Sequence, residues 1–160
     1  MELCEYSLAE WLRRQGTAER DLPRMIGWFK QMVTAVAYIH DHGLIHRDLK
    51  PSNILFSSPD HLNICDFGIT THIQLKLENE TEVTATYPDI GSALYMAPEQ
   101  SGWRYTSKVD VFTLGLILAE LCVYMTVFDR KEAEFVSWLS QVDKSKRPTC
   151  REMLKHSFLE

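Results

Sequence analysis

Residues 46–53 read His-Arg-Asp-Leu-Lys-Pro-Ser-Asn, a polar run that stands between an apolar helical pattern and an apolar hairpin pattern. Asp-Phe-Gly follows at residues 66–68, and Ala-Pro-Glu at residues 97–99. A fixed pattern of seven residues arises at a given position roughly once in a billion draws, so chance does not explain these motifs. They contain carboxylates, an amide and a lysine. Phosphoryl transfer needs such groups to orient and deprotonate an acceptor hydroxyl and to neutralise the phosphate oxygens.

The flanks of residues 46–53 predict a helix before the run and a hairpin after it. Asp21 with Pro23 supplies a helix start, and Gly43 tolerates the left-handed conformation just past a helix end. The apolar runs 54–56 and 62–65 enclose a turn rich in Ser, Pro and Asp, which predicts a strand-turn-strand hairpin. Between the helix signals, apolar residues recur every three or four positions at Met25, Ile26, Phe29, Met32, Val33, Val36 and Ile39.

The C-terminal half predicts a loop followed by helices. Residues 68–91 show little periodicity, which predicts a long regulatory loop. Residues 109–128 are apolar all round but are interrupted by Asp110 and Glu120. The uninterrupted apolar run that these two charges leave is too short for a membrane span of about 20 residues, so the stretch predicts a buried core helix. Two capping-box spacings predict further helices, at Asp129 with Glu132 and at Thr149 with Glu152. The prediction is one mainly α domain with a small two-stranded element.

Composition narrows the class of protein. The chain has 160 residues, 45% of them hydrophobic, which is typical of one soluble globular domain. The formal net charge is -5 and the 17 Lys and Arg residues are scattered, which argues against a nucleic-acid surface. Glu2 and Glu5 argue against a signal peptide after Met1. The four cysteines are Cys4, Cys65, Cys122 and Cys150. They form no Cys-x-x-Cys pair, so we expect reduced thiols and a cytoplasmic protein.

The three motifs, in this order, resemble the signature set of eukaryotic protein kinases, and the resemblance covers nearly the whole chain. It implies that residues 1–160 are a partial protein kinase domain, made of the interlobe segment and the C-terminal lobe. That lobe is a helical bundle with a small β-hairpin that carries the catalytic and metal-binding loops. The sequence holds no glycine-rich phosphate loop, no Val-Ala-Ile-Lys strand and no partner glutamate, so we expect the N-terminal lobe to be absent and this chain alone to be inactive.

The resemblance also implies roles for the residues of the motifs, with ATP and Mg²⁺ as cofactors. Asp48 would orient the acceptor hydroxyl and take its proton, and Lys50 would steady the transferring phosphate. Asn53 and Asp66 would bind magnesium and, through it, the nucleotide, while Leu55 would pack against adenine. The purely structural explanation for Asp48 is an aspartate that stabilises a turn, and for Asp66 it is a cap at the end of the hairpin. They do not account for all four polar residues at once.

The residue before Asp48 implies regulation by phosphorylation. Arg47 resembles the arginine that pairs with a phosphorylated activation-loop residue in this family. The candidates are Thr81, Thr84, Thr86 and Tyr87, and we favour Thr84 or Thr86 because both lie shortly before Gly91.

Five residues are expected to have structural roles within the resemblance. Phe67 would pack on His46 and switch between active and inactive arrangements. Asp110 would hold the backbone of the catalytic loop, and Glu99 would form a buried ion pair with Arg147.

Finer features point to substrates of the Ser/Thr type. Lys50, together with Ser92 before the Ala-Pro-Glu motif, resembles the Ser/Thr pattern rather than the tyrosine pattern. The segments 1–12, 94–100 and 108–118 resemble the kinases of the alpha subunit of eukaryotic translation initiation factor two. The interval from Asp110 to Arg147 is shorter than in typical family members, at the place where a docking helix for that factor sits.

Three hypotheses follow: a Ser/Thr protein kinase whose partners are protein substrates and other kinase chains, a kinase-like binding or inhibitory module without activity, and a small-molecule phosphotransferase. The Ala97-Pro98-Glu99 motif argues against the third. A zinc cluster of His40, His42 and His46 is disfavoured because the spacing is wrong for a closed site.

Overall fold

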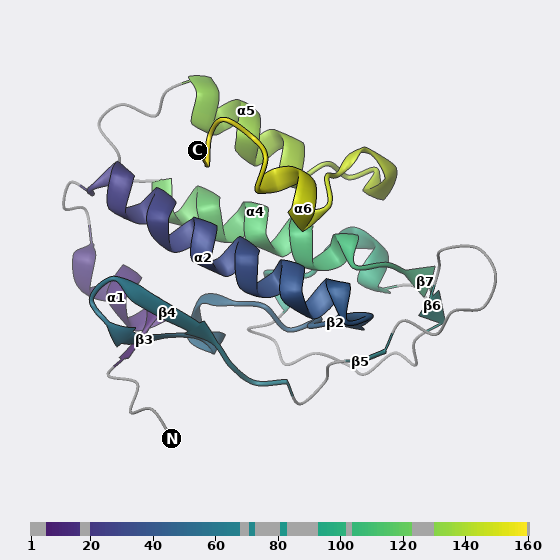
Figure 1. The fold of residues 1–160 in the computed structure, drawn as a ribbon, viewed down its shortest axis with the longest axis horizontal. Coiled ribbons are helices and arrows are strands. Elements are labelled where there is room, and N and C mark those ends of the chain that lie inside the picture. The colour runs from purple at the N-terminus through teal and green to yellow at the C-terminus, as the bar shows by residue number, and fades with distance from the viewer. Residues whose placement is uncertain are drawn as a thin grey trace.

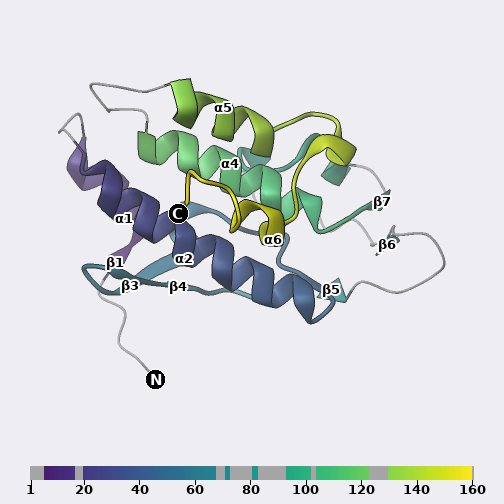
Figure 2. The same cartoon turned by 45° about the horizontal axis from the view of Figure 1, so that its top comes forward.

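The computed structural model describes residues 6–16, 20–67, 71–72, 81–82, 93–101, 104–122 and 130–159. Two long helices, α2 (Leu22–Asp41) and α4 (Lys108–Cys122), lie side by side through the middle of the molecule (Figure 1). Helix α5 (Arg130–Leu139) packs on α4, and the short α6 (Cys150–Met153) packs on α2. The hairpin of residues 54–64 lies on the side of α2 that faces away from α5, as the turned view also shows (Figure 2). The prediction of a mainly α fold is confirmed.

Helix α2 begins and ends where the sequence predicts. The side chain of Asp21 accepts a hydrogen bond from the backbone N–H of Arg24, and Pro23 lies in the first turn. Gly43 follows the helix with a φ of +69°, the left-handed conformation that glycine adopts at low cost. One face of α2 is buried in the core by Trp28, Phe29 and the other apolar residues of the predicted pattern. The helix therefore delivers the chain directly to residue 44.

The predicted hairpin is present and has a third strand. Strands β3 (Ile54–Ser58) and β4 (His61–Ile64) pair antiparallel, and β1 (Tyr6–Ser7) pairs with β3 on its other edge. The prediction of a two-stranded element missed β1, because two residues are too few to show an alternating pattern. Ser7 also caps α1 (Leu8–Gln15) in a reciprocal capping box with Glu10.

Short elements occupy the rest of the described chain. Strand β2 (Leu44–Ile45) pairs with β5 (Thr71–His72), and β6 (Thr81–Glu82) pairs with β7 (Arg104–Tyr105). The predicted long loop over residues 68–91 contains β5 and β6, whose pairing partners lie far away in sequence, and its other residues lie outside the described residues. Three 3-10 turns complete the list: η1 (Pro51–Asn53), η2 (Pro98–Ser101) and η3 (Lys144–Lys146).

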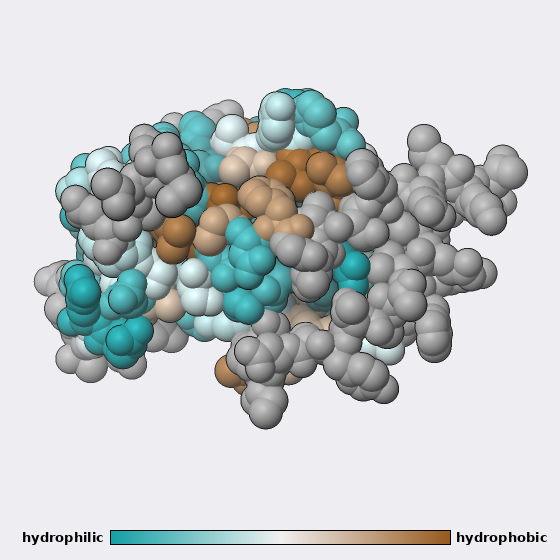
Figure 3. Space-filling view, turned by 90° about the horizontal axis from the view of Figure 1, so that it is seen from below, coloured by the Kyte–Doolittle hydropathy of each residue, from teal (hydrophilic) through white to brown (hydrophobic). Residues whose placement is uncertain are grey.

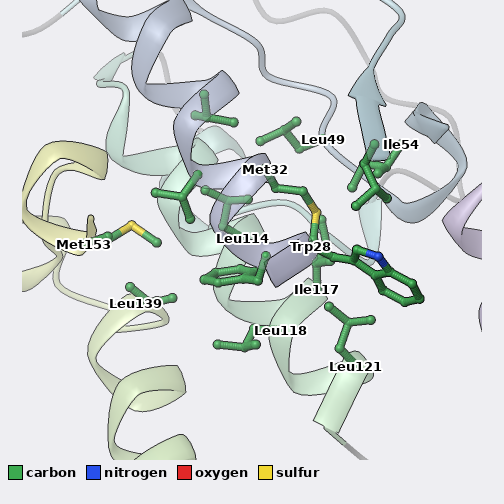
Figure 4. Packing of buried hydrophobic residues seen from close by; sticks show 14 of the residues in the cluster. Trp28, Met32, Leu49, Ile54, Leu114, Ile117, Leu118, Leu121, Leu139 and Met153 are labelled. Atoms are coloured by element: carbon green, nitrogen blue, oxygen red, sulfur yellow. The ribbon is translucent and has the colours of Figure 1, made fainter. Parts of the chain in front are cut away.

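Helix α4 is the buried core helix that the sequence predicts, and residues 123–128 of the predicted stretch lie outside the described residues. The Arg20 guanidinium donates to the carbonyls of Glu120 and Leu121, which satisfies acceptors that a helix end leaves unpaired. The apolar side chains of α4 belong to the same buried cluster as Trp28 of α2 and Leu139 of α5 (Figure 4).

Of the two predicted capping boxes, that of Thr149 and Glu152 is present at the start of α6. The box of Asp129 and Glu132 lies outside the described residues. No helix in the described part of the chain is both long enough and apolar enough to cross a membrane.

Helix α4 packs closely against the end of α5 at Gly115. A Cβ at this position would lie 2.9 Å from Leu139 Cβ and 3.3 Å from the Ser140 nitrogen. We expect Gly115→Ala to lower the free energy of unfolding by about 1–3 kcal/mol through overpacking. Gly27→Ala is the control, because a Cβ there meets nothing within 4 Å. It should instead stabilise α2 by about 0.5–1 kcal/mol. Chemical denaturation measures both, and equal effects would contradict the close packing.

Candidate active site

Residues 46–53 are held by the buried side chain of Asp110, which is 1% exposed at the start of α4. Its carboxylate accepts hydrogen bonds from the backbone N–H groups of His46 and Arg47, both at 2.9 Å. It also lies 2.8 Å from Nε2 of His40, on α2. Arg47 has a φ of +74°, a conformation that non-glycine residues seldom adopt. Asp110 therefore fixes the backbone of the loop in a strained geometry just before Asp48.

Asp48, Lys50 and Asn53 converge in this loop. The Lys50 ammonium lies 2.9 Å from Oδ2 of Asp48. The Asn53 amide nitrogen donates to the same oxygen at 3.2 Å and to the Asp48 carbonyl at 2.9 Å. All three side chains are partly or fully shielded from solvent. Because the amide nitrogen of Asn53 makes both bonds, its Oδ1 is the atom that can bind a metal ion.

Asp66 follows the end of the hairpin, directly after Cys65, and its side chain is exposed. The backbone N–H of Cys65 donates to the Asn53 carbonyl at 2.9 Å, which ties the residue before Asp66 to the end of the loop. Asp66 has a φ of +64°, so it too is held in the left-handed region. A carboxylate and an amide oxygen suit Mg²⁺, which prefers hard oxygen ligands and keeps sites for water and phosphates. The donor set therefore fits magnesium.

His46 joins the loop to the segment that carries Asp66. Its Nδ1 accepts from the backbone N–H of Asp48 at 3.3 Å, so the ring proton belongs on Nε2, which lies 3.1 Å from the Cys65 carbonyl. The rings of His46 and Phe67 have centroids 5.1 Å apart, and Phe67 is 51% exposed. The structure thus places Phe67 on His46, where the sequence predicts it.

Glu99 and Arg147 form an ion pair, with nitrogen to oxygen distances of 2.5 and 3.0 Å. The Arg147 side chain is fully buried, and it also donates to three backbone carbonyls. Lys108 in turn donates to the Arg147 carbonyl at 2.6 Å, and burial lowers the pKa of its ammonium. These bonds fix the Ala-Pro-Glu segment to the C-terminal part of the chain.

The regulatory candidates are only partly placed. Thr84 and Thr86 lie outside the described residues, so the structure does not bring them to Arg47. The Arg47 guanidinium lies 5.7 Å from the ring centroid of Tyr105. Burial raises the pKa of Tyr105, and the nearby Arg47 opposes that rise.

Leu55, the residue expected to pack against adenine, is half-buried in β3, opposite Asn63.

Two polar side chains at the site were not predicted. His40 binds Asp110 from the end of α2, although the sequence suggested only a comparison with a zinc cluster. Gln100 accepts from the Ala97 N–H at 2.8 Å and donates to the Arg47 carbonyl at 3.3 Å. The His40–Asp110 and Gln100–Arg47 contacts each join residues more than 50 positions apart, so no local sequence pattern predicts them.

A groove of about 710 Å³ runs between α2 and β4 and reaches Phe67. Its walls include Ala35 and Tyr38 on the helix and Leu62 and Ile64 on the strand. Figure 3 views the molecule from the side of the strands and shows hydrophobic residues gathered between hydrophilic ones. This part of the molecule thus presents apolar surface next to the site.

Comparison with known proteins identifies the family of the chain. The model of the protein kinase domain family matches residues 1–134. The chain is 34% identical to eukaryotic translation initiation factor 2-alpha kinase pek-1 of Caenorhabditis elegans over 194 aligned positions, covering 100% of the chain and 18% of the relative. It is 36% identical to the interferon-induced, double-stranded RNA-activated protein kinase of Rattus norvegicus, covering 97% of the chain and 34% of the relative.

A third relative is eukaryotic translation initiation factor 2-alpha kinase 3 of Bos taurus, 41% identical over 76% of the chain and 12% of the relative. The chain therefore spans about a third or less of the length of these relatives. The alignment of 194 positions is longer than the 160 residues of the chain, so the nematode relative has additional residues inside the matched region.

Proposed function

Because the chain belongs to the protein kinase domain family, we propose that it provides the catalytic loop of a Ser/Thr protein kinase, which transfers the γ-phosphate of ATP to a protein hydroxyl. The observation that supports this most is the convergence of Lys50 and Asn53 on the carboxylate of Asp48. Asp66 follows directly after the residue that is bonded to Asn53. Such a set matches the requirements of phosphoryl transfer, which depends mainly on positioning and electrostatic stabilisation.

Each residue has a separate task in this proposal. Asp48 orients the acceptor hydroxyl and accepts its proton, and its carboxylate is held for that purpose by the Asn53 amide. Lys50 brings a positive charge to the oxygens of the transferring phosphate. Asn53 Oδ1 and the Asp66 carboxylate would hold Mg²⁺. When bound, the ion neutralises charge on the ATP phosphates. Leu55 provides an apolar contact for the adenine ring.

For the acceptor, we propose the alpha subunit of eukaryotic translation initiation factor two. The names of the relatives support it, because two of the three are initiation factor 2-alpha kinases. The test is to incubate the full-length protein with labelled ATP and either the purified alpha subunit or a generic Ser/Thr protein. We expect the subunit to be labelled at least about tenfold faster, which is the discrimination that about 1.4 kcal/mol of selective binding provides. Labelling of the generic protein alone would refute this acceptor but leave a Ser/Thr kinase.

A catalytically inactive, kinase-like binding module is the second candidate. It is favoured by the apolar groove beside Phe67. Binding of a kinase or a substrate without any phosphate transfer would support this candidate. A small-molecule phosphotransferase remains the weakest alternative, because the Ala-Pro-Glu segment is tied into the fold by the Glu99–Arg147 pair.

We also propose a cytoplasmic location and other kinase chains as partners. Within the described residues, Cys65, Cys122 and Cys150 form no disulfide with one another, which is compatible with a reducing compartment.

Regulation should depend on Thr84 or Thr86. A phosphate adds a charge of about -1.5 to -2 and can form charge-assisted hydrogen bonds with an arginine such as Arg47. We expect replacement of both threonines by Ala in the full-length protein to lower kcat/KM by about tenfold or more. Thr34→Ala on the exposed face of α2 is the control and should leave the rate unchanged. If the double variant phosphorylates its acceptor as fast as the wild type, these threonines are not the regulatory sites.

A further inference from the structure

Cys65 is hydrogen-bonded to both ends of the loop of residues 46–53. Its backbone N–H and its thiol both donate to the Asn53 carbonyl, at 2.9 Å and 3.3 Å. Its own carbonyl accepts from Nε2 of His46 at 3.1 Å. A carbonyl oxygen has two lone pairs, so the Asn53 carbonyl accepts the N–H and the thiol together. The residue after β4 therefore joins the beginning of the loop to its end.

Asn53 is held from two sides. Its amide nitrogen donates to the carbonyl of Asp48 at 2.9 Å and to Oδ2 of Asp48 at 3.2 Å, which restricts rotation of the side chain. The two donors of Cys65 fix the backbone from which that side chain projects. Asn53 is 6% exposed, so little water is available to replace these partners. The position of Asn53 Oδ1 therefore depends on Asp48 and on Cys65.

Packing alone does not explain the thiol of Cys65. A reduced cysteine often serves as a small apolar side chain in a protein core. Cys122 and Cys150 fit that description, because they are 1% and 2% exposed and belong to the main buried cluster. Cys65 is only partly buried and lies outside that cluster, and its sulfur is bonded to a candidate metal-binding residue. Its place in the structure indicates a positioning role.

We propose that the Cys65 thiol is a positioning group for the metal site, because its bond to the Asn53 carbonyl holds Asn53 Oδ1 ready for an ion that Asp66 would also bind. Asp66 follows Cys65 directly and has a φ of +64°, so one residue fixes both candidate ligands. Groups that orient metal ligands typically change metal affinity about 10–100-fold when they are removed. This inference rests on the proposed kinase function, and Cys65 itself does not touch the ion.

Cys65→Ala and Cys65→Ser form a matched pair, because the two new side chains differ by one hydroxyl and only serine can donate. The first test is hydrogen exchange on the full-length protein, which requires neither metal nor activity. We expect Cys65→Ala to speed exchange at the amide of residue 65 by about threefold or more, because the Asn53 carbonyl loses one of its donors. Cys65→Ser should stay within about twofold of wild type.

The second test measures the metal site itself. Mn²⁺ is a paramagnetic substitute for Mg²⁺, so electron paramagnetic resonance reports its binding to the full-length protein with a non-hydrolysable ATP analogue. A thiol is a weak donor, so we expect Cys65→Ala to weaken Mn²⁺ binding by about tenfold, the low end of the range for such groups. Cys65→Ser should stay within about threefold of wild type. The Mg²⁺ concentration for half-maximal transfer should rise as Mn²⁺ affinity falls, while KM for the acceptor stays within about twofold.

Cys122→Ala is the control for general damage. It removes a buried thiol from the last turn of α4, so it should lower the melting temperature. Mn²⁺ affinity and exchange at residue 65 should both stay at the wild-type values.

The outcomes separate this inference from the proposed function. Wild-type exchange or wild-type Mn²⁺ affinity in Cys65→Ala would overturn the positioning role, even if the protein is an active kinase. Equal losses in Cys65→Ala and Cys65→Ser would also overturn it, because they would identify the thiol as a space-filling group. A folded wild-type protein that binds no Mn²⁺ with the nucleotide would refute the proposed function and, with it, the role of Cys65 at the metal site.

Discussion

Asp48→Asn and Asp66→Asn should each abolish phosphate transfer by the full-length protein, lowering kcat by about 10³-fold or more. A positioned general base contributes typically about 10²–10⁴-fold, and loss of a magnesium ligand removes charge stabilisation at the same step. Both substitutions keep the size of the side chain, and Asn can still accept a hydrogen bond from Lys50 or Asn53 at residue 48. The measurement is the initial rate with radiolabelled ATP at saturating substrate.

Asp60→Asn is the matched control for these variants. Asp60 lies exposed in the turn of the hairpin, where it pairs with Arg24 at 2.6 Å, and it has no role in the proposed mechanism. An exposed pair of this kind contributes about 0–1 kcal/mol, so the control should keep wild-type activity. Activity of either catalytic variant within a few-fold of wild type would remove that residue from the proposed mechanism.

The second large effect concerns the 160-residue chain by itself. We expect it to bind ATP with magnesium no more tightly than about 1 mM and to show negligible turnover on a generic Ser/Thr peptide. Protein kinases need a strand lysine paired with a helix glutamate, and a closed cleft that excludes water. None of these features is present in the sequence of this chain. The exposed Phe67 and the adjoining apolar groove would favour association with other proteins instead.

Isothermal calorimetry with magnesium and ATP measures the affinity, and a coupled assay on the same sample measures turnover. The full-length protein in parallel provides the positive control. Micromolar affinity together with steady turnover by the purified chain would show that the residues of this lobe suffice. In that case the requirement for a second lobe would be wrong.

The helical part of the fold was accessible from the sequence because its signals are local. Asp21, Pro23 and Gly43 mark the ends of α2 within a few residues of the observed bounds. The turn between β3 and β4 likewise follows from adjacent residues. Strands β1, β5 and β6 were missed because each has two residues and is defined by a distant partner.

The candidate site shows the same division. The identities of Asp48, Lys50, Asn53 and Asp66 follow from motif order and from resemblance to the kinase family. The hydrogen bonds that position these residues do not follow from the sequence. His40 and Asp110 are 70 residues apart in the sequence, and the hydrophobic patterns of the two helices do not predict their contact. The left-handed conformation at Asp66 likewise depends on the surrounding fold, since an isolated aspartate would seldom adopt it.

The central claim is that Asp48, Lys50, Asn53 and Asp66 form a site for transfer of phosphate to Ser or Thr. The most direct test is transfer of labelled γ-phosphate by the full-length protein to the alpha subunit of initiation factor two, followed by analysis of the labelled amino acid. The account predicts label on serine or threonine only, dependent on magnesium and lost in Asp48→Asn. Label on tyrosine, or no label from a folded protein that binds ATP and the acceptor, would contradict it.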